Sequence, residues 1–127
     1  MRSSRVYEIE LNDRPEDVRT ARMFFRDIAV RFELTDAQSE AGELALSELV
    51  TNAIVHAGGV ITVRACREDQ GIRLEVIDGD PQPPRMAKLE PGGFDTGGLP
   101  IVAAVAHEWG WDEGPDGTGK RVWLTLA

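Results

Sequence analysis

Cysteine is almost absent from this sequence of 127 residues, in which Cys66 is the single copy. A lone cysteine excludes an internal disulfide. Long apolar runs are also missing, because no stretch reaches the roughly 18 residues that a membrane-spanning helix requires. The N-terminal residues lead into an alternating pattern instead of the apolar segment of a signal peptide. We therefore expect a cytoplasmic protein that does not associate with membranes.

Positive charge is in deficit. The chain has 14 Lys and Arg against 22 Asp and Glu, which gives a net charge of −8. A field of this sign repels phosphate backbones and anionic lipids, so direct nucleic-acid binding is excluded as the expected function. An anionic small ligand must arrive with a cation or find a local cluster of backbone N–H groups.

The composition is that of an ordinary globular domain, with 42% hydrophobic and 28% charged residues. A chain of this length makes about one domain and buries roughly two thirds of its unfolded surface. We therefore treat residues 1–127 as a single domain.

The first half of the chain predicts a strand and two helices. Val6 to Leu11 alternates apolar with mostly charged residues, as a half-buried strand does. Pro15, with Asp13 before it and acidic residues after it, begins a helix that we expect to reach about Phe32. Thr35 and Gln38 form the pattern of a capping box for a second helix, which ends near Ala57 at two glycines.

The second half predicts strands around one long loop. A hairpin precedes the loop, and a short helix and two strands follow it. Loops of this length are uncommon and usually functional. Together the elements predict an α+β two-layer sandwich, with about five strands in a mixed, largely antiparallel sheet and three helices on one face. The expected segments are strands Val60–Arg67 and Ile72–Ile77, the loop Asp78–Asp95, the helix Gly97–His107, and strands Glu108–Trp111 and Lys120–Leu126.

Polar residues on the second helix form the most informative pattern. An apolar stripe predicts the face that packs on the core. Glu48, Thr51 and Asn52 lie opposite this stripe, and Glu48 and Asn52 are neighbours because they are one turn apart. Taken alone, they indicate a solvated helix face. The stripe consists of Leu46, Leu49, Val50, Ala53, Ile54 and Ala57.

Three further segments have both a structural and a functional interpretation. Asp78 follows an apolar strand, where an Asp is most often a turn former. Gly97 and Gly98 open a helix, where free backbone N–H groups favour phosphate. Gly119 lies in a Gly-Thr-Gly-Lys segment that enters the last strand and is compatible with a simple hairpin turn.

Taken in order, these four segments resemble the nucleotide-binding boxes of the GHKL superfamily, which contains gyrase, histidine kinases and mismatch-repair ATPases and has the Bergerat-type fold. The chain looks most like the small branch of bacterial anti-sigma factor serine kinases of the RsbW type, and the resemblance covers nearly the whole chain. It rests on segments 48–53, 56–57, 97–104, 109–110 and 119–123, and on Asp78.

The resemblance also implies roles for individual residues. Asn52 would bind Mg²⁺, and Glu48 would serve as the base or as a ligand of a metal-bound water. Asp78 would accept a hydrogen bond from the adenine amino group. The remaining residues expected to contact ATP are Thr96, Gly97, Gly98, Leu99 and Gly119.

The sequence departs from the family pattern in two places. The first glycine box keeps only its aspartate, Asp78. In the second, Gly97 and Gly98 are adjacent and Thr96 stands where an earlier glycine is usual. We therefore expect a phosphate loop that is shorter than usual or differently shaped.

The leading hypothesis is an ATP-binding anti-sigma factor that acts as a serine/threonine-protein kinase on an anti-anti-sigma partner. Its implied cofactors are ATP and Mg²⁺, its implied partners are a sigma factor and the anti-anti-sigma factor, and its implied assembly is a homodimer. The alternative is a nucleotide-binding interaction module without phosphotransfer. A detached catalytic domain of a histidine kinase is a third hypothesis.

Overall fold

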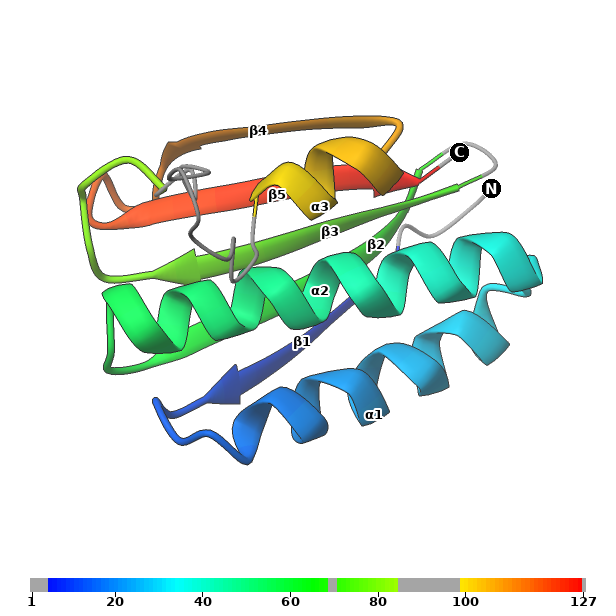
Figure 1. Ribbon diagram of the computed structural model, residues 1–127, viewed down its shortest axis with the longest axis horizontal. Coiled ribbons are helices and arrows are strands. Elements are labelled where there is room, and N and C mark those ends of the chain that lie inside the picture. The colour runs from blue at the N-terminus through cyan, green and yellow to red at the C-terminus, as the bar shows by residue number, and fades with distance from the viewer. Residues whose placement is uncertain (1–4, 69–70, 85–98, 127) are drawn as a thin grey trace, which may run out of the picture.

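The computed structural model describes residues 5–68, 71–84 and 99–126. Two long helices follow the first strand, a hairpin follows the helices, and a short helix with two strands completes the described chain (Figure 1). The elements are β1 (Val6–Leu11), α1 (Asp17–Arg31), α2 (Asp36–His56), β2 (Ile61–Glu68), β3 (Gly71–Asp78), α3 (Leu99–Val105), β4 (Glu108–Glu113) and β5 (Lys120–Leu126).

The strands form one sheet in the order β1-β2-β3-β5-β4. All four pairings between neighbouring strands are antiparallel, so the prediction of a mixed sheet was wrong on this point. The cause is the chain path: β5 enters between β3 and β4 and runs against both. Figure 1 shows the three helices covering the same face of the sheet, which confirms the two-layer α+β sandwich.

The start of α2 follows its sequence signal closely. The Thr35 hydroxyl accepts from the Gln38 backbone N–H at 3.1 Å, and the Gln38 side chain accepts from the Thr35 N–H at 2.8 Å. These reciprocal bonds satisfy two donors that a helix start leaves without partners, so the predicted capping box is confirmed. The helix ends at His56, one residue before the expected Ala57.

The start of α1 differs from its prediction. The helix begins at Asp17, two residues after Pro15. The Asp13 carboxylate accepts from the distant Gly59 backbone N–H at 3.0 Å, so it ties the start of α1 to the end of α2 instead of capping its own helix. Asp17 accepts from the Asn12 backbone N–H at 2.9 Å, which orients the turn between β1 and α1.

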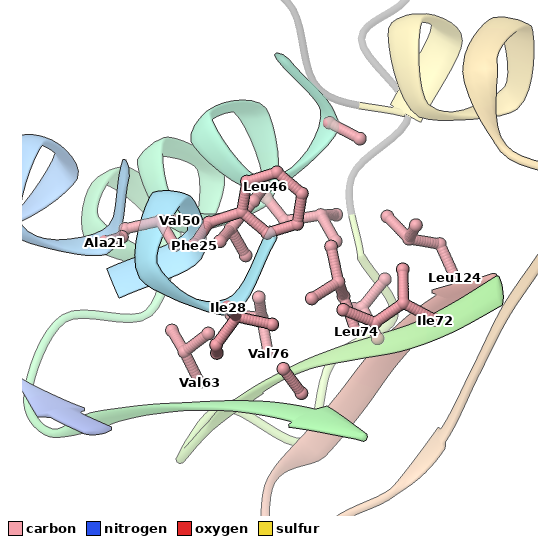
Figure 2. Packing of buried hydrophobic residues seen from close by; sticks show 14 of the residues in the cluster. Ala21, Phe25, Ile28, Leu46, Val50, Val63, Ile72, Leu74, Val76 and Leu124 are labelled. Carbon is pink, nitrogen blue, oxygen red and sulfur yellow. The ribbon is translucent and has the colours of Figure 1, made fainter. Parts of the chain in front are cut away.

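The core lies between the helices and the sheet. Figure 2 shows Phe25 and Leu46 on the helix side of the core and Val63 and Leu74 on the sheet side. Gly42 permits the close contact between the two long helices, because a Cβ atom there would collide with the Phe25 ring. Of the predicted stripe on α2, four residues are buried, and Ile54 and Ala57 are partly buried. None of the helices among the described residues has the length and apolar character needed to cross a membrane.

The outer face of the sheet is polar. Register partners Glu8, Arg64 and Glu75 form a row across β1, β2 and β3, which Trp123 of β5 continues. Arg64 pairs with Glu8 at 2.8 Å and lies 3.9 Å from Glu75. The guanidinium of Arg73 binds Glu75 at 2.9 Å and stacks 4.5 Å from the Trp123 ring centre. This face therefore presents ion pairs and an aromatic ring to the surroundings.

Candidate functional site

The two polar residues of interest on α2 are half-buried instead of fully solvated. Glu48 and Asn52 lie one turn apart, so their side chains are neighbours on the helix surface. Thr51, between them in sequence, is exposed. A plain solvated face would expose all three, so the pattern indicates that Glu48 and Asn52 border a neighbouring part of the domain.

The side of α2 that carries Asn52 turns away from α1. Ser47 and Glu43 mark the side that faces α1, because they bind Arg22 at 3.1 Å and Arg26 at 2.7 Å. At 3.6 residues per turn, Asn52 lies about 140° around the helix axis from Ser47. The helix α3 packs on α2 on the side opposite α1 (Figure 1). Asn52 therefore lies on the α3 side of the helix layer.

Asp78, at the end of β3, is almost completely buried, with 5% of its surface exposed. Its Oδ1 atom accepts from the Lys120 ammonium at 3.0 Å and from the Asp80 backbone N–H at 2.9 Å. The second bond makes Asp78 a turn former at the start of the loop, as the structural interpretation predicted. The first bond gives it a buried counterion that the sequence analysis did not predict.

Gly119 allows Asp78 and Lys120 to lie side by side. Its φ of +69° is a conformation that residues with a Cβ atom rarely adopt. A Cβ atom there would also collide with the carbonyl oxygen of Asp78. The glycine thus lets β5 begin directly beside the end of β3, where Asp78 and Lys120 are register partners.

The candidate residues on α2, β3 and β5 lie at one end of the described structure. The C-terminal half of α2, the end of β3 and the start of β5 lie at the same end in Figure 1. The structure brings Asp78 directly onto Gly119, and α2 packs on β3. Leu99 is the first residue of α3. The other predicted phosphate-loop residues, Thr96, Gly97 and Gly98, lie outside the described residues.

Lys120 is the residue that sequence reasoning missed. A signal for it was present, because Lys120 alternates with Val122, Leu124 and Leu126, the apolar face of the last strand. A lysine in register with the buried face of a strand requires a partner of opposite charge. The pairing of β3 with β5 places Asp78 beside this lysine, and it joins residues far apart in sequence.

The donor set on α2 suits a small hard cation shared with phosphates. Mg²⁺ is usually held by one or two protein oxygen ligands, with substrate phosphates and waters completing its octahedron. Asn52 offers a neutral amide oxygen, and Glu48 offers a carboxylate one turn away. Within residues 5–68, 71–84 and 99–126, no three His, Cys, Asp or Glu side chains cluster as an all-protein metal site would require.

Cys66 lies on the outer face of β2, away from these residues. Burial raises the pKa of its thiol above the usual range, and the carboxylates of Glu75 and Glu68 raise it further. A thiol with a raised pKa is a poor nucleophile at neutral pH. We therefore expect Cys66 to be chemically inert at neutral pH.

Comparison with known proteins identifies a relative by sequence and a solved structure that has the same fold. Over 75 residues the chain is 33% identical to an anti-sigma F factor from Clostridium acetobutylicum. The match covers 56% of this chain and 52% of that protein, so the chain spans about half the length of its relative. The crystal structure of the RsbU and RsbW domains of Rv1364c from Mycobacterium tuberculosis superposes with a TM-score of 0.73 at 22% identity. That match covers 96% of this chain and 32% of the other, and it establishes the fold.

The family itself follows from a match along most of the sequence. The sequence pattern of the histidine kinase-like ATPase domain fits residues 11–126, a range that includes α2, the end of β3 and the start of β5. This match and the shared fold agree with the resemblance that the four segments suggested. The chain therefore belongs to the histidine kinase-like ATPase domain family.

Proposed function

We propose that this protein binds Mg²⁺-ATP and acts as an anti-sigma factor with serine/threonine-protein kinase activity toward an anti-anti-sigma partner. The observation that carries the proposal is the family match over residues 11–126, which spans both Asn52 on α2 and the buried Asp78 at the same end of the domain. The similarity to an anti-sigma F factor supports the choice of partners. We propose that the protein acts in the cytoplasm and forms a homodimer.

In this proposal each residue has one task. Asp78 accepts a hydrogen bond from the adenine amino group, and Asn52 supplies an oxygen ligand to Mg²⁺. When bound, Mg²⁺ would neutralise part of the phosphate charge that a protein of net charge −8 repels. The backbone amides of Gly97 and Gly98 would hold phosphate oxygens, and Thr96, Leu99 and Gly119 would supply the remaining contacts to ATP.

Phosphoryl transfer would then need a base. A serine or threonine hydroxyl oxygen of the partner attacks the γ-phosphorus, a new P–O bond forms, and the bond from the γ-phosphorus to the β,γ-bridging oxygen breaks to release ADP. Glu48 takes the proton of the attacking hydroxyl. Loss of such a base commonly lowers a rate by about 10² to 10⁴.

Binding is tested first. Asn52→Ala should abolish Mg²⁺-dependent ATP binding measured by calorimetry and leave the fold intact, because Asn52 is not part of the buried core. Thr51→Ala is the matched control, since Thr51 is an exposed polar neighbour on the same helix. Equal ATP affinity in the parent and in Asn52→Ala would contradict the site assignment.

Catalysis is tested with Glu48→Gln, which keeps the size of the side chain and removes the base. ATP binding should persist, and transfer of radiolabel from γ-labelled ATP to candidate anti-anti-sigma proteins should fall by about 10²-fold or more. Glu43→Gln is the control, because Glu43 faces α1 and pairs with Arg26. If the parent binds Mg²⁺-ATP and a partner but labels none of the candidates, the alternative of an ATP-gated interaction module replaces the kinase.

A further inference from the structure

A buried lysine at the start of β5 has no role in the function proposed above. Lys120 is 3% exposed and lies on the face of the strand that carries Val122 and Leu124 into the core. It is one of only two lysines in the sequence. Lysines are almost never fully buried unless they are paired, so this position calls for a specific explanation.

Stability alone explains it poorly. The Nζ atom of Lys120 lies 3.0 Å from Asp78 Oδ1, 3.4 Å from the Asp80 carbonyl oxygen and 4.0 Å from Asp80 Oδ2. Taking two charges out of water opposes much of their attraction, and buried ion pairs can often be replaced by apolar residues without loss of stability. The surrounding positions on both strands are apolar already, so an apolar pair would fit the pattern.

The chemistry of the pair suggests a ligand. It presents a carboxylate acceptor and an ammonium donor side by side, 3.0 Å apart, at the end of β3, which is part of the proposed nucleotide site. The hydrogen-bonding edge of adenine presents the reverse pattern, because the exocyclic amine at C6 is a donor and the adjacent ring nitrogen N1 is an acceptor. Guanine in the same orientation would place its carbonyl oxygen O6 against the carboxylate and its N1–H against the ammonium, so both contacts would be repulsive.

We propose that Lys120 is a specificity-determining residue of the nucleotide site, which donates an N–H of its ammonium group to N1 of adenine while Asp78 accepts from the amine at C6. An ammonium has three N–H groups, and its described hydrogen bonds go to Asp78 Oδ1 and the Asp80 carbonyl. The third is the one assigned to adenine. This inference rests on the proposed ATP binding and adds a second contact to the base.

The first test uses the unmodified protein and three nucleotides. Calorimetry compares ATP with 1-deaza-ATP, which has a C–H in place of N1, and with 7-deaza-ATP, which keeps N1. We expect 1-deaza-ATP to bind about tenfold more weakly than ATP or worse, as the loss of a hydrogen bond to a charged group implies. The affinity for 7-deaza-ATP should stay within about threefold of ATP, because the lost N7 is not on the edge that Lys120 and Asp78 contact.

The second test assigns the preference to Lys120. In Lys120→Met the ratio of ATP affinity to 1-deaza-ATP affinity should fall to about one, whereas Arg121→Met should keep the ratio of the parent. Arg121 is the matched control, since it neighbours Lys120 in sequence but pairs with Asp112 on the outer face. Because Lys120→Met leaves Asp78 buried without a counterion, the pair Asp78→Asn with Lys120→Met is measured as well. The Asn side chain still offers an oxygen to the amine at C6.

The outcomes separate the two proposals. Equal affinity of the parent for ATP and 1-deaza-ATP overturns the role of Lys120 and leaves ATP binding standing. A preference for ATP that survives in both Lys120 variants also overturns it. If the parent binds none of the three nucleotides in the presence of Mg²⁺, the proposed function fails, and the inference about Lys120 fails with it.

Discussion

The two faces of the sheet both carry ion pairs, but in opposite surroundings. On the outer face, the Arg64–Glu8 pair has side chains that are 33% and 45% exposed. On the inner face, the Lys120 and Asp78 side chains are 4% and 3% exposed at a similar separation of 3.0 Å. Water screens the first pair and almost none reaches the second, so the same chemistry has different energetic consequences. The fold therefore tolerates the desolvation cost of a buried ion pair at Lys120 and Asp78.

Breaking the buried pair should give the largest effect. Asp78→Asn leaves the Lys120 ammonium buried beside a neutral amide, with the Asp80 carboxylate 4.0 Å away as its remaining counterion. We expect a loss of about 3 to 5 kcal/mol in the free energy of unfolding. Urea denaturation followed by circular dichroism measures this. Adding Lys120→Met should restore most of the loss, because removing both partners leaves no uncompensated charge. If Asp78→Asn is as stable as the parent, breaking an ion pair on the inner face costs no more than breaking one on the outer face.

Gly119→Ala should have the next largest effect, since it separates the pair without removing a charge. The left-handed backbone conformation costs a residue with a Cβ atom about 1 to 2 kcal/mol, and the collision with the Asp78 carbonyl adds to this. We expect a total of about 2 to 3 kcal/mol, measured by the same denaturation. Gly117→Ala has a similar φ of +72° but open space around the added atom, so it isolates the contribution of the collision.

Glu8→Gln on the outer face should change stability by less than about 1 kcal/mol, as exposed ion pairs usually contribute little. Raising the salt concentration should reduce even this difference, because the pair is accessible to counterions. A loss comparable to that of Asp78→Asn would remove the contrast between the two faces.

Cys66 gives the mildest test of the outer face. Because burial raises the pKa of its thiol, we expect alkylation by iodoacetamide at pH 8 to be slower in the folded protein than in urea. The folded-state rate should keep rising at a higher pH than the unfolded-state rate, since the thiolate forms later. The Cys66 thiol makes its full contribution to the free energy of unfolding at pH values below its unfolded-state pKa. This contribution decreases as the pH rises above that value, because the folded state disfavours the thiolate.

The sequence predicted the parts of the fold that depend on neighbours in the chain. The capping box of Thr35 and Gln38, the apolar stripe of α2 and the hairpin of β2 and β3 are all specified within a few residues. Each of these was confirmed. The start of α1 was misplaced because Asp13 binds Gly59, which is close in space but distant in sequence.

The candidate site follows the same division. Glu48 and Asn52 were found as a pair because helical spacing places them together. Asp78 was identified by its position after a strand, but its counterion was not, since the Asp78–Lys120 contact requires the register of β3 with β5. Apart from the β2–β3 hairpin, the antiparallel direction of the pairings was unpredictable for the same reason. Roles in binding and catalysis remain predictions for all these residues.

The pairing of β1 with β2 has a consequence for the order of folding. Its register joins Leu11 to Ile61 and Val6 to Cys66, across the whole of α1 and α2. Closing so long a segment costs chain entropy that the hairpin of β2 and β3 does not incur, because that hairpin joins adjacent strands. We therefore expect the hairpin and the helix pair to assemble early and β1 to dock last. Substitutions that destabilise β1 should therefore speed unfolding and leave the folding rate nearly unchanged, because β1 docks after the transition state.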